Sequence, residues 1–296
     1  MRAGAGRLRL ALAMALTGVP HAGAVAVPAE APAVSVAART RMVAEVSAAL
    51  RRAHLREDAR LRAILAVLAR LPRERFVPAE QRASAYELRA LPIGNGQTIS
   101  DPFIIAYMTR ALALDPGDHV LEVGTGSGYQ AAVLAALGVR VHTVEIVPEL
   151  AARAAATLRA EGYGNVQVRQ GDGYAGWPEA APFDAIIVTA GAVRIPPALI
   201  AQLRPGGRMI LPLGPNWAEQ LLTLVRKRRD GRLDVSPCGG VSFVPFVGEA
   251  QRPEQGAPGV WGRRLRGRCL APLRADGAAG RSARSLGGRA AQRSAV

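Results

Sequence analysis

Between residues 119 and 213, short apolar runs alternate regularly with helical stretches. Each run has the length and the β-branched content of a single strand, and the stretches between the runs have helical spacing. This alternation predicts an α/β fold with a doubly wound parallel sheet that helices cover on both faces. The predicted strands are His119–Val123, Val141–Val144, Val166–Arg169, Ala185–Val188 and Arg208–Leu213, and the predicted helices are Tyr129–Leu137, Pro148–Ala160 and Pro196–Leu203.

The sequence before the sheet is predominantly helical. Apolar residues recur at helical spacing from Thr40 to Leu71, which predicts two helices broken near residues 54–58. Residues 76–100 are rich in loop formers and predict a long loop. A further helix is predicted over Pro102–Leu114, with Asp101 near its start.

Beyond the last parallel strand, Leu221–Arg226 and Leu233–Val235 predict a closing antiparallel hairpin. We therefore expect one domain over residues 42–249. Within it, residues 42–118 form an N-terminal helical cap with a substrate loop, and residues 119–249 form the cofactor-binding sheet and the hairpin. Residues 1–41 are predicted to be an extension, with a linker at 25–39, and residues 250–296 to be a basic, disordered tail.

The formal net charge of +15 is concentrated at the two ends of the chain. Residues 250–296 hold ten Arg against two acids, a net charge of +8, and residues 1–49 contribute +3, so the segment between carries about +4. The tail could bind RNA or an anionic membrane, because affinity for phosphate follows charge. We expect no specific nucleic acid or membrane partner, since Trp261 is the tail's only aromatic residue.

Two cysteines, Cys238 and Cys269, lie far apart in the sequence. With the second in the predicted tail, we expect neither a disulfide nor a metal site, and Cys238 is expected to be a buried or edge thiol.

The most informative motif is a strand that runs into a glycine-rich turn and then opens a helix, residues 120–129. Glycine is needed there because a side chain would collide with a ligand lying across the carboxyl end of the strand. Glu145 ends the next strand, 21 residues after Gly124, near the spacing at which an acid meets ribose hydroxyls. Asp172 follows the third strand, at the adenine end of the same crevice.

The spacing of the glycines separates two cofactor classes. The nicotinamide fingerprint places a third glycine where this chain has Tyr129. The turn here, Gly-Thr-Gly-Ser-Gly, suits a ligand without a pyrophosphate, and Glu122 precedes it at a position near a cationic methionine moiety. These features favour S-adenosyl-L-methionine over a nicotinamide dinucleotide.

Several further motifs resemble the protein-L-isoaspartate (D-aspartate) O-methyltransferase family over residues 42–249. They are Leu91-Pro92-Ile93-Gly94, residues 96–100 (Gly-Gln-Thr-Ile-Ser), the Gly124 turn, Gly171-Asp172-Gly173, residues 183–190, Pro205-Gly206-Gly207 and Phe243-Val244-Pro245. Most methyltransferases lack the element at 97–100. Asn95, Asp101 and Ser242 stand where other members of the family often differ.

The resemblance implies a doubly wound, Rossmann-like S-adenosylmethionine-dependent methyltransferase fold with N-terminal helices and a C-terminal antiparallel hairpin. It assigns Ser100 to the active site and predicts no metal. The predicted cofactor-binding residues are Gln97, Thr98, Ile99, Glu122, Gly124, Thr125, Gly126, Ser127, Gly128, Glu145, Asp172 and Gly173.

The resemblance also implies the reaction, which is methylation of the free carboxylate of L-isoaspartyl and D-aspartyl residues in damaged proteins. Such a carboxylate is ionised at neutral pH and needs no general base, so Ser100 is expected to position it by a hydrogen bond. We expect a monomer. The alternatives are a methyltransferase acting on a small molecule and a nucleic-acid-binding protein that uses the basic tail.

The N-terminus permits two interpretations. Three arginines precede the uncharged run Leu10–Val19, and small residues follow at 22–24, a pattern typical of a signal peptide. Alternatively, translation begins at Met42, where an amphipathic pattern starts. S-adenosylmethionine is a cytosolic cofactor, so we expect a cytoplasmic enzyme, with a periplasmic or secreted enzyme as the alternative.

Overall fold

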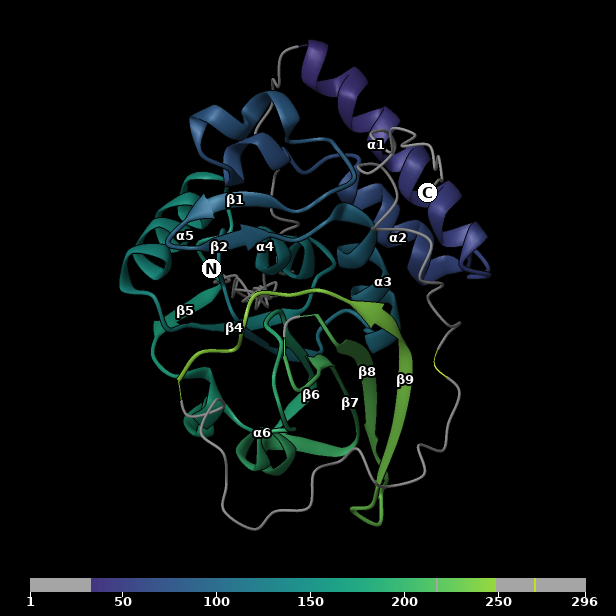
Figure 1. The fold of residues 1–296 in the computed structure, drawn as a ribbon, viewed down its shortest axis with the longest axis vertical. Helices are drawn as coiled ribbons and strands as arrows, with labels where there is room; N and C mark the ends of the chain where they lie inside the picture. Colours follow the sequence, from purple (N-terminus) through teal and green to yellow (C-terminus); the bar gives the residue numbers. More distant parts are fainter. Residues whose placement is uncertain (1–32, 217, 249–268, 270–296) are drawn as a thin grey trace, which may run out of the picture.

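The computed structural model describes residues 33–216, 218–248 and 269, which form a central sheet with a helical cap (Figure 1). Helix α1 spans Ala33–Arg52, and helix α2 spans Ala59–Leu68. The two helices and the break between them are confirmed, and His54 in the break has a left-handed φ of 57°. The linker predicted over 25–39 is wrong for residues 33–39, which are helical because this Ala-rich stretch has no proline after Pro32.

The loop predicted over residues 76–100 is also partly wrong. It contains the 3-10 helix η2 (Ala79–Ser84) and an antiparallel hairpin of β1 (Leu91–Gly94) and β2 (Gln97–Ile99). Gly94, Asn95 and Gly96 all have positive φ and make the turn. The two strands are so short that their sequence resembles loop, and they form a separate two-stranded sheet.

The main sheet has seven strands in the order β5-β4-β3-β6-β7-β8-β9. The first five strands of this order are parallel, as predicted, and β8 and β9 are antiparallel. The strands are β3 His119–Val123, β4 Arg140–Glu145, β5 Gln167–Gln170, β6 Phe183–Val188, β7 Leu203–Leu213, β8 Gln220–Lys227 and β9 Leu233–Val241. The order reverses between β3 and β6, and in such sheets ligands bind at the carboxyl ends of the strands beside this switch.

Helices cover both faces of the sheet, as expected for a doubly wound fold. They are α3 Pro102–Leu112, α4 Tyr129–Ala136, α5 Pro148–Ala160 and α6 Pro197–Gln202, with the 3-10 helices η1 Arg73–Phe76, η3 Gly173–Ala175 and η4 Pro178–Ala180. Asp101 is the N-cap of helix α3, and its side chain accepts a hydrogen bond from the Phe103 N–H.

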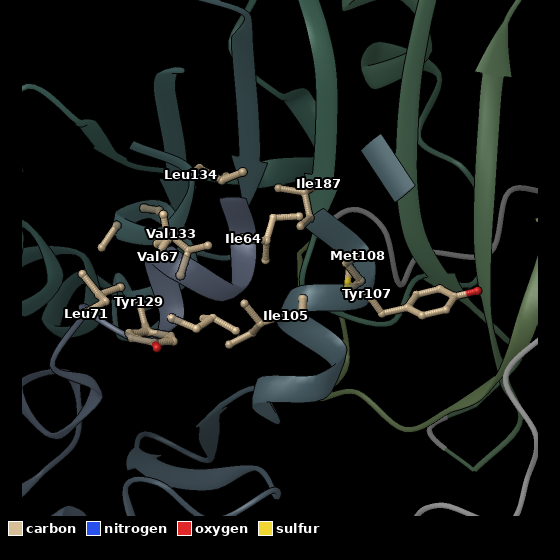
Figure 2. Packing of buried hydrophobic residues seen from close by; sticks show 14 of the residues in the cluster. Ile64, Val67, Leu71, Ile105, Tyr107, Met108, Tyr129, Val133, Leu134 and Ile187 are labelled. Carbon is tan, nitrogen blue, oxygen red and sulfur yellow. The ribbon is translucent and has the colours of Figure 1, made fainter. Parts of the chain in front are cut away.

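Alternate residues of the strands belong to two different cores. Val120 and Ile187 lie in the core on the side of α2, α3 and α4, whereas Leu121 and Val188 lie in the core on the side of α6. Figure 2 shows the first core, where Ile64 of α2, Ile105 of α3 and other labelled side chains converge from the helices and the sheet. The helical cap is thus anchored on the sheet that carries the glycine turn.

The C-terminal hairpin is confirmed, with β9 longer than predicted. The expectation of two unpaired cysteines is wrong, because Cys238 of β9 and Cys269 form a disulfide. The Tyr107 hydroxyl of α3 lies 3.5 Å from the Cys269 sulfur, and in Figure 2 the Tyr107 side chain points away from the other labelled residues. Apart from Cys269, the tail prediction for residues 250–296 lies outside the described residues. Among the helices that the structure describes, none has the length and hydropathy needed to span a membrane.

Candidate functional site

A pocket lies at the carboxyl ends of β3, β4 and β6, beside the switch in strand order. It holds about 530 Å³ of space, part of it open to solvent. Its walls come from the β1–β2 hairpin, the glycine turn, the ends of the strands and the segment after β9. The lining residues are Gln97, Thr98, Val123, Gly124, Gly126, Val144, Glu145, Ile146, Gly173, Thr189, Ala190, Val244, Pro245, Phe246 and Val247.

The glycine turn has a backbone that side chains would not permit. Gly124 has a φ of 95°, and a Cβ atom there would lie 2.4 Å from the Thr189 hydroxyl oxygen. That hydroxyl donates a hydrogen bond to the Gly124 carbonyl, at 2.6 Å. Gly126 also has a positive φ and lines the pocket. The turn therefore presents backbone, not side chains, to the pocket.

Glu145 secures the turn from the end of β4. One of its carboxylate oxygens accepts the Gly126 N–H at 2.7 Å, and the other accepts the Val147 N–H at 3.0 Å. The residue is buried but lines the pocket. Each oxygen retains a lone pair after these bonds, so the carboxylate can also accept hydroxyl donors from a ligand.

Glu122 lies beneath the pocket and does not line it. It is completely buried, and neither carboxylate oxygen has a hydrogen-bond partner among the described residues. The pKa of Glu122 is raised to about 8, chiefly by burial and also by the Glu145 charge, while the Thr143 hydroxyl opposes the shift. Without a ligand, this carboxyl is thus largely protonated at neutral pH.

Gly173 lines the pocket beyond β5, whereas its neighbour Asp172 does not. A Cβ at Gly173 would lie 2.3 Å from a Val123 methyl group, so only glycine allows this close approach. The Asp172 carboxylate accepts the Tyr174 N–H and caps η3. The structure gives Asp172 a role in a turn and leaves its predicted role in cofactor binding as a prediction.

Three other predicted cofactor residues in the turn make their contacts inside the protein. The Thr125 hydroxyl lies 2.7 Å from that of Thr143, and the Ser127 hydroxyl accepts the Tyr129 N–H. Gly128 has a φ of 86° and lies where a Cβ would contact Leu158 of α5. These residues support the turn through contacts within the protein. That they also contact a cofactor stays a prediction.

The β1–β2 hairpin brings Gln97 and Thr98 to the pocket. Ile99 is buried in the core, and Ser100, half-buried, follows it in the link to α3. Asp101 is the N-cap of α3, so Ser100 does not cap this helix. Burial raises the pKa of Asp101, opposed by the Phe103 N–H and by nearby Arg73. Ser100 is near the pocket in sequence but does not line it.

Six of the lining residues, Thr189, Ala190 and residues 244–247, were not predicted to belong to the site. The first four of them, through Pro245, stand inside motifs that carried the family resemblance, which was the available signal, whereas Phe246 and Val247 lie outside these motifs. Local sequence could not indicate their function, because the Thr189 N–H bonds to the Val123 carbonyl of β3 and the segment after β9 pairs with Gly191, and these partners are distant in the sequence.

Comparisons with known proteins agree with this geometry. A family model for protein-L-isoaspartate(D-aspartate) O-methyltransferase matches residues 42–251. The chain is 56% identical over 187 residues to a protein-L-isoaspartate O-methyltransferase of Opitutus terrae, an alignment that covers 63% of this chain and 80% of the relative. A second relative, from Syntrophobacter fumaroxidans and named protein-L-isoaspartate O-methyltransferase 2, is 51% identical over 72% of this chain and 87% of its own length.

Solved structures show the same fold. A protein-L-isoaspartate O-methyltransferase structure aligns with a TM-score of 0.63 at 28% identity, over 72% of this chain and 67% of that one. A Plasmodium falciparum structure, described as a putative enzyme of the same name in complex with S-adenosyl-L-homocysteine, aligns with a TM-score of 0.59 at 21% identity, over 71% of this chain and 98% of that one. The matched model, the relatives and the glycine-turn pocket together show that the chain belongs to the protein-L-isoaspartate(D-aspartate) O-methyltransferase family.

Proposed function

We propose that the chain transfers a methyl group from S-adenosylmethionine to the free carboxylate of L-isoaspartyl and D-aspartyl residues in damaged proteins. The observation that carries this proposal is the position of the β1–β2 hairpin. Its Gln97 and Thr98 form a wall of the pocket at the strand ends, and the element at 97–100 is the part of the motif that distinguishes this family.

The pocket residues fit the cofactor. Gly124, Gly126 and Gly173 leave space where side chains would intrude, and the Glu145 carboxylate is placed to accept ribose hydroxyls. Val144, Ile146 and Phe246 add apolar walls of the kind that a base requires. When bound, S-adenosylmethionine supplies a methyl group on a positively charged sulfur.

The chain's own contribution is to orient the acceptor and to exclude water. The acceptor carboxylate is ionised at neutral pH, so no side chain has to remove a proton. Both reactants lose charge as the methyl group moves, which an environment poor in water favours. Ser100, in the link between the hairpin and α3, is proposed to donate a hydrogen bond that holds the acceptor carboxylate in line.

Transfer of a labelled methyl group to an isoaspartyl peptide, beside the same peptide with normal aspartate, tests the activity. Label on the isoaspartyl peptide alone is the expected result. Binding of the cofactor without transfer to either peptide would instead favour the alternative of a small-molecule acceptor.

Replacement of Ser100 tests its role. We expect Ser100→Ala to lower kcat/KM for the peptide by about 10- to 100-fold, because the acceptor is no longer aligned. Affinity for S-adenosylhomocysteine, measured by calorimetry, should stay unchanged. Ser100→Thr keeps the hydroxyl and is the matched control, which should retain more activity. An equal loss of cofactor affinity in Ser100→Ala would contradict the assignment.

The rival function as a nucleic-acid-binding protein depends on the Arg-rich tail. Removing residues 251–296 should leave methylation intact and abolish any affinity for RNA that follows the tail's charge. The cut also removes Cys269, so Cys269→Ala in the full chain is the control. We further propose that the enzyme is a monomer, which sedimentation of the full chain would test.

We propose a cytoplasmic enzyme, because S-adenosylmethionine is a cytosolic cofactor. The alternative is an exported enzyme, which the Cys238–Cys269 disulfide favours because disulfides persist in oxidising compartments and are rare in the cytosol. Alkylation of free thiols in intact cells, followed by fractionation, distinguishes the two. A reduced pair in the cytoplasmic fraction supports the proposal, and an oxidised pair outside that fraction supports the alternative.

A further inference from the structure

The segment of residues 242–248, which we name the strap, forms one wall of the pocket without belonging to the sheet. It leaves β9 and runs back across the carboxyl ends of the parallel strands (Figure 1). Residues 244–247 line the pocket, and Phe246 is buried in the core on the α6 side. The position of the strap therefore sets part of the boundary of the pocket.

Two backbone hydrogen bonds tie the strap to the loop after β6. The Gly191 N–H donates to the Val244 carbonyl at 2.8 Å, and the Phe246 N–H donates to the Gly191 carbonyl at 2.9 Å. Gly191 thus pairs with the strap as a single residue of a strand would. Pairing with a single residue is a weak restraint on a segment that forms a wall of the pocket.

Gln220, at the start of β8, supplies a second attachment. Its side-chain amide is buried, donates to the Phe243 carbonyl at 3.1 Å and accepts the Phe243 N–H at 2.7 Å. This pair of bonds satisfies both backbone groups of Phe243, the residue directly before the four that line the pocket. The Gln220 side chain thus makes the two backbone bonds to Phe243 that a neighbouring strand would otherwise make.

The approach of Gln220 depends on Gly191. A Cβ at Gly191 would lie only 2.0 Å from the Gln220 amide nitrogen, so a side chain there would displace the amide. Gln220 and Gly191 therefore pack against each other and hold the strap at Phe243 and at Val244–Phe246. Gln220 itself does not line the pocket.

From this arrangement we infer that Gln220 is a positioning residue for cofactor binding, which acts by holding the strap against the pocket. The inference rests on the proposed function, since the ligand it concerns is S-adenosylmethionine. Without the amide, Phe243 has two unsatisfied backbone groups, and the strap can move away from the glycine turn. The cofactor must then restore the position of the strap when it binds, which lowers its affinity.

Replacement of Gln220 by methionine tests the inference, because methionine has a similar length and no hydrogen-bonding amide. We expect Gln220→Met to weaken binding of S-adenosylhomocysteine by about tenfold, measured by calorimetry on the full chain. The KM for S-adenosylmethionine should rise by a similar factor, while kcat at saturating cofactor should change little. A loss of kcat with an unchanged KM would overturn the inference.

Lys227→Met is the matched control. Lys227 lies at the other end of β8, and its ammonium group donates to two backbone carbonyls, those of Ile200 at 2.8 Å and Leu203 at 2.7 Å. Neither Lys227 nor these two partners line the pocket. We expect Lys227→Met to lower the melting temperature as Gln220→Met does, with less than about a twofold change in affinity. Equal losses of affinity in both variants would mean that lower stability of the fold alone weakens cofactor binding. That result would overturn the inference.

The same experiment separates this inference from the proposed function. If the unaltered chain does not bind S-adenosylhomocysteine, the proposed function fails. If it binds and Gln220→Met binds equally well, the inference about Gln220 fails alone.

Discussion

The Glu122 carboxyl is titratable and completely buried. Its ionisation therefore makes the free energy of unfolding depend on pH, which can be measured. The carboxyl ionises near 4.5 when exposed, but its pKa in the fold is about 8. Between these values the unfolded chain releases a proton that the folded chain keeps. The contribution of Glu122 to stability is therefore fully present below about pH 4.5 and is lost as the pH rises to about 8.

Replacing Glu122 by glutamine removes this titration. We expect the free energy of unfolding of Glu122→Gln, relative to that of the unaltered protein, to increase steadily from pH 5 to about pH 8 and then to level off. Denaturant unfolding of the ligand-free protein at a series of pH values measures the difference. Glu149→Gln, at an exposed position in α5, is the control, and a similar slope for both variants would contradict the burial argument.

At the scale of elements, Asp58 joins two helices of the cap. Its carboxylate caps α2 by accepting the Leu61 N–H at 2.9 Å, and it also binds the Arg110 guanidinium of α3. The start of α2 is thus fixed to α3. Helix α3 in turn packs on β6 and β7, and it follows the hairpin that carries Gln97 and Thr98. One side chain therefore supports the helical layer beside the pocket.

We expect Asp58→Ala to lower the free energy of unfolding by about 1–2 kcal/mol through loss of the cap, with a further loss from the ion pair. Asp115→Ala is the matched control. Asp115 also pairs with an arginine, Arg60, but both side chains are largely exposed, and such pairs contribute about 0–1 kcal/mol. Chemical denaturation of both variants measures the difference. Equal losses in the free energy of unfolding would contradict a stabilising role for Asp58 as the N-cap of α2.

At the scale of the whole molecule, the Cys238–Cys269 disulfide ties residue 269 to the sheet across a sequence separation of 31 residues. A crosslink of this kind stabilises mainly by restricting the unfolded chain, typically by about 2–4 kcal/mol. Cys238 is fully buried in the same core as α2 and α3. The end of β9 is therefore held by a covalent bond as well as by strand pairing.

We expect Cys269→Ala to unfold at lower denaturant concentration than the oxidised protein, by about 2–4 kcal/mol. Reductant should bring the unaltered protein to the stability of the variant and leave the variant itself unchanged. Thiol titration under denaturing conditions should find free cysteines only after reduction. Stability that does not respond to reductant would show that the disulfide contributes nothing.

Much of the fold could be predicted from the sequence because the information is local. Apolar, β-branched runs predicted β3, β4 and β6 closely, and helical spacing after Pro148 predicted α5. The hairpin of β1 and β2 was missed because Pro92, Gly94 and Gly96 give this segment the composition of a loop. Helix α1 starts seven residues before Thr40, because its first turns lack the apolar spacing on which the prediction depended.

In the site, local sequence is enough to predict the residues whose role depends on the backbone next to them. Gly124, Gly126 and Glu145 follow from strand, turn and helix in direct succession, and all three line the pocket. Four features became visible only in the folded chain: the burial of Glu122, the two bonds of Gln220 to Phe243, the position of the strap and the pairing of Cys238 with Cys269. Each of these depends on segments that are distant in the sequence, and the free energy of such contacts is set by packing that no local pattern records.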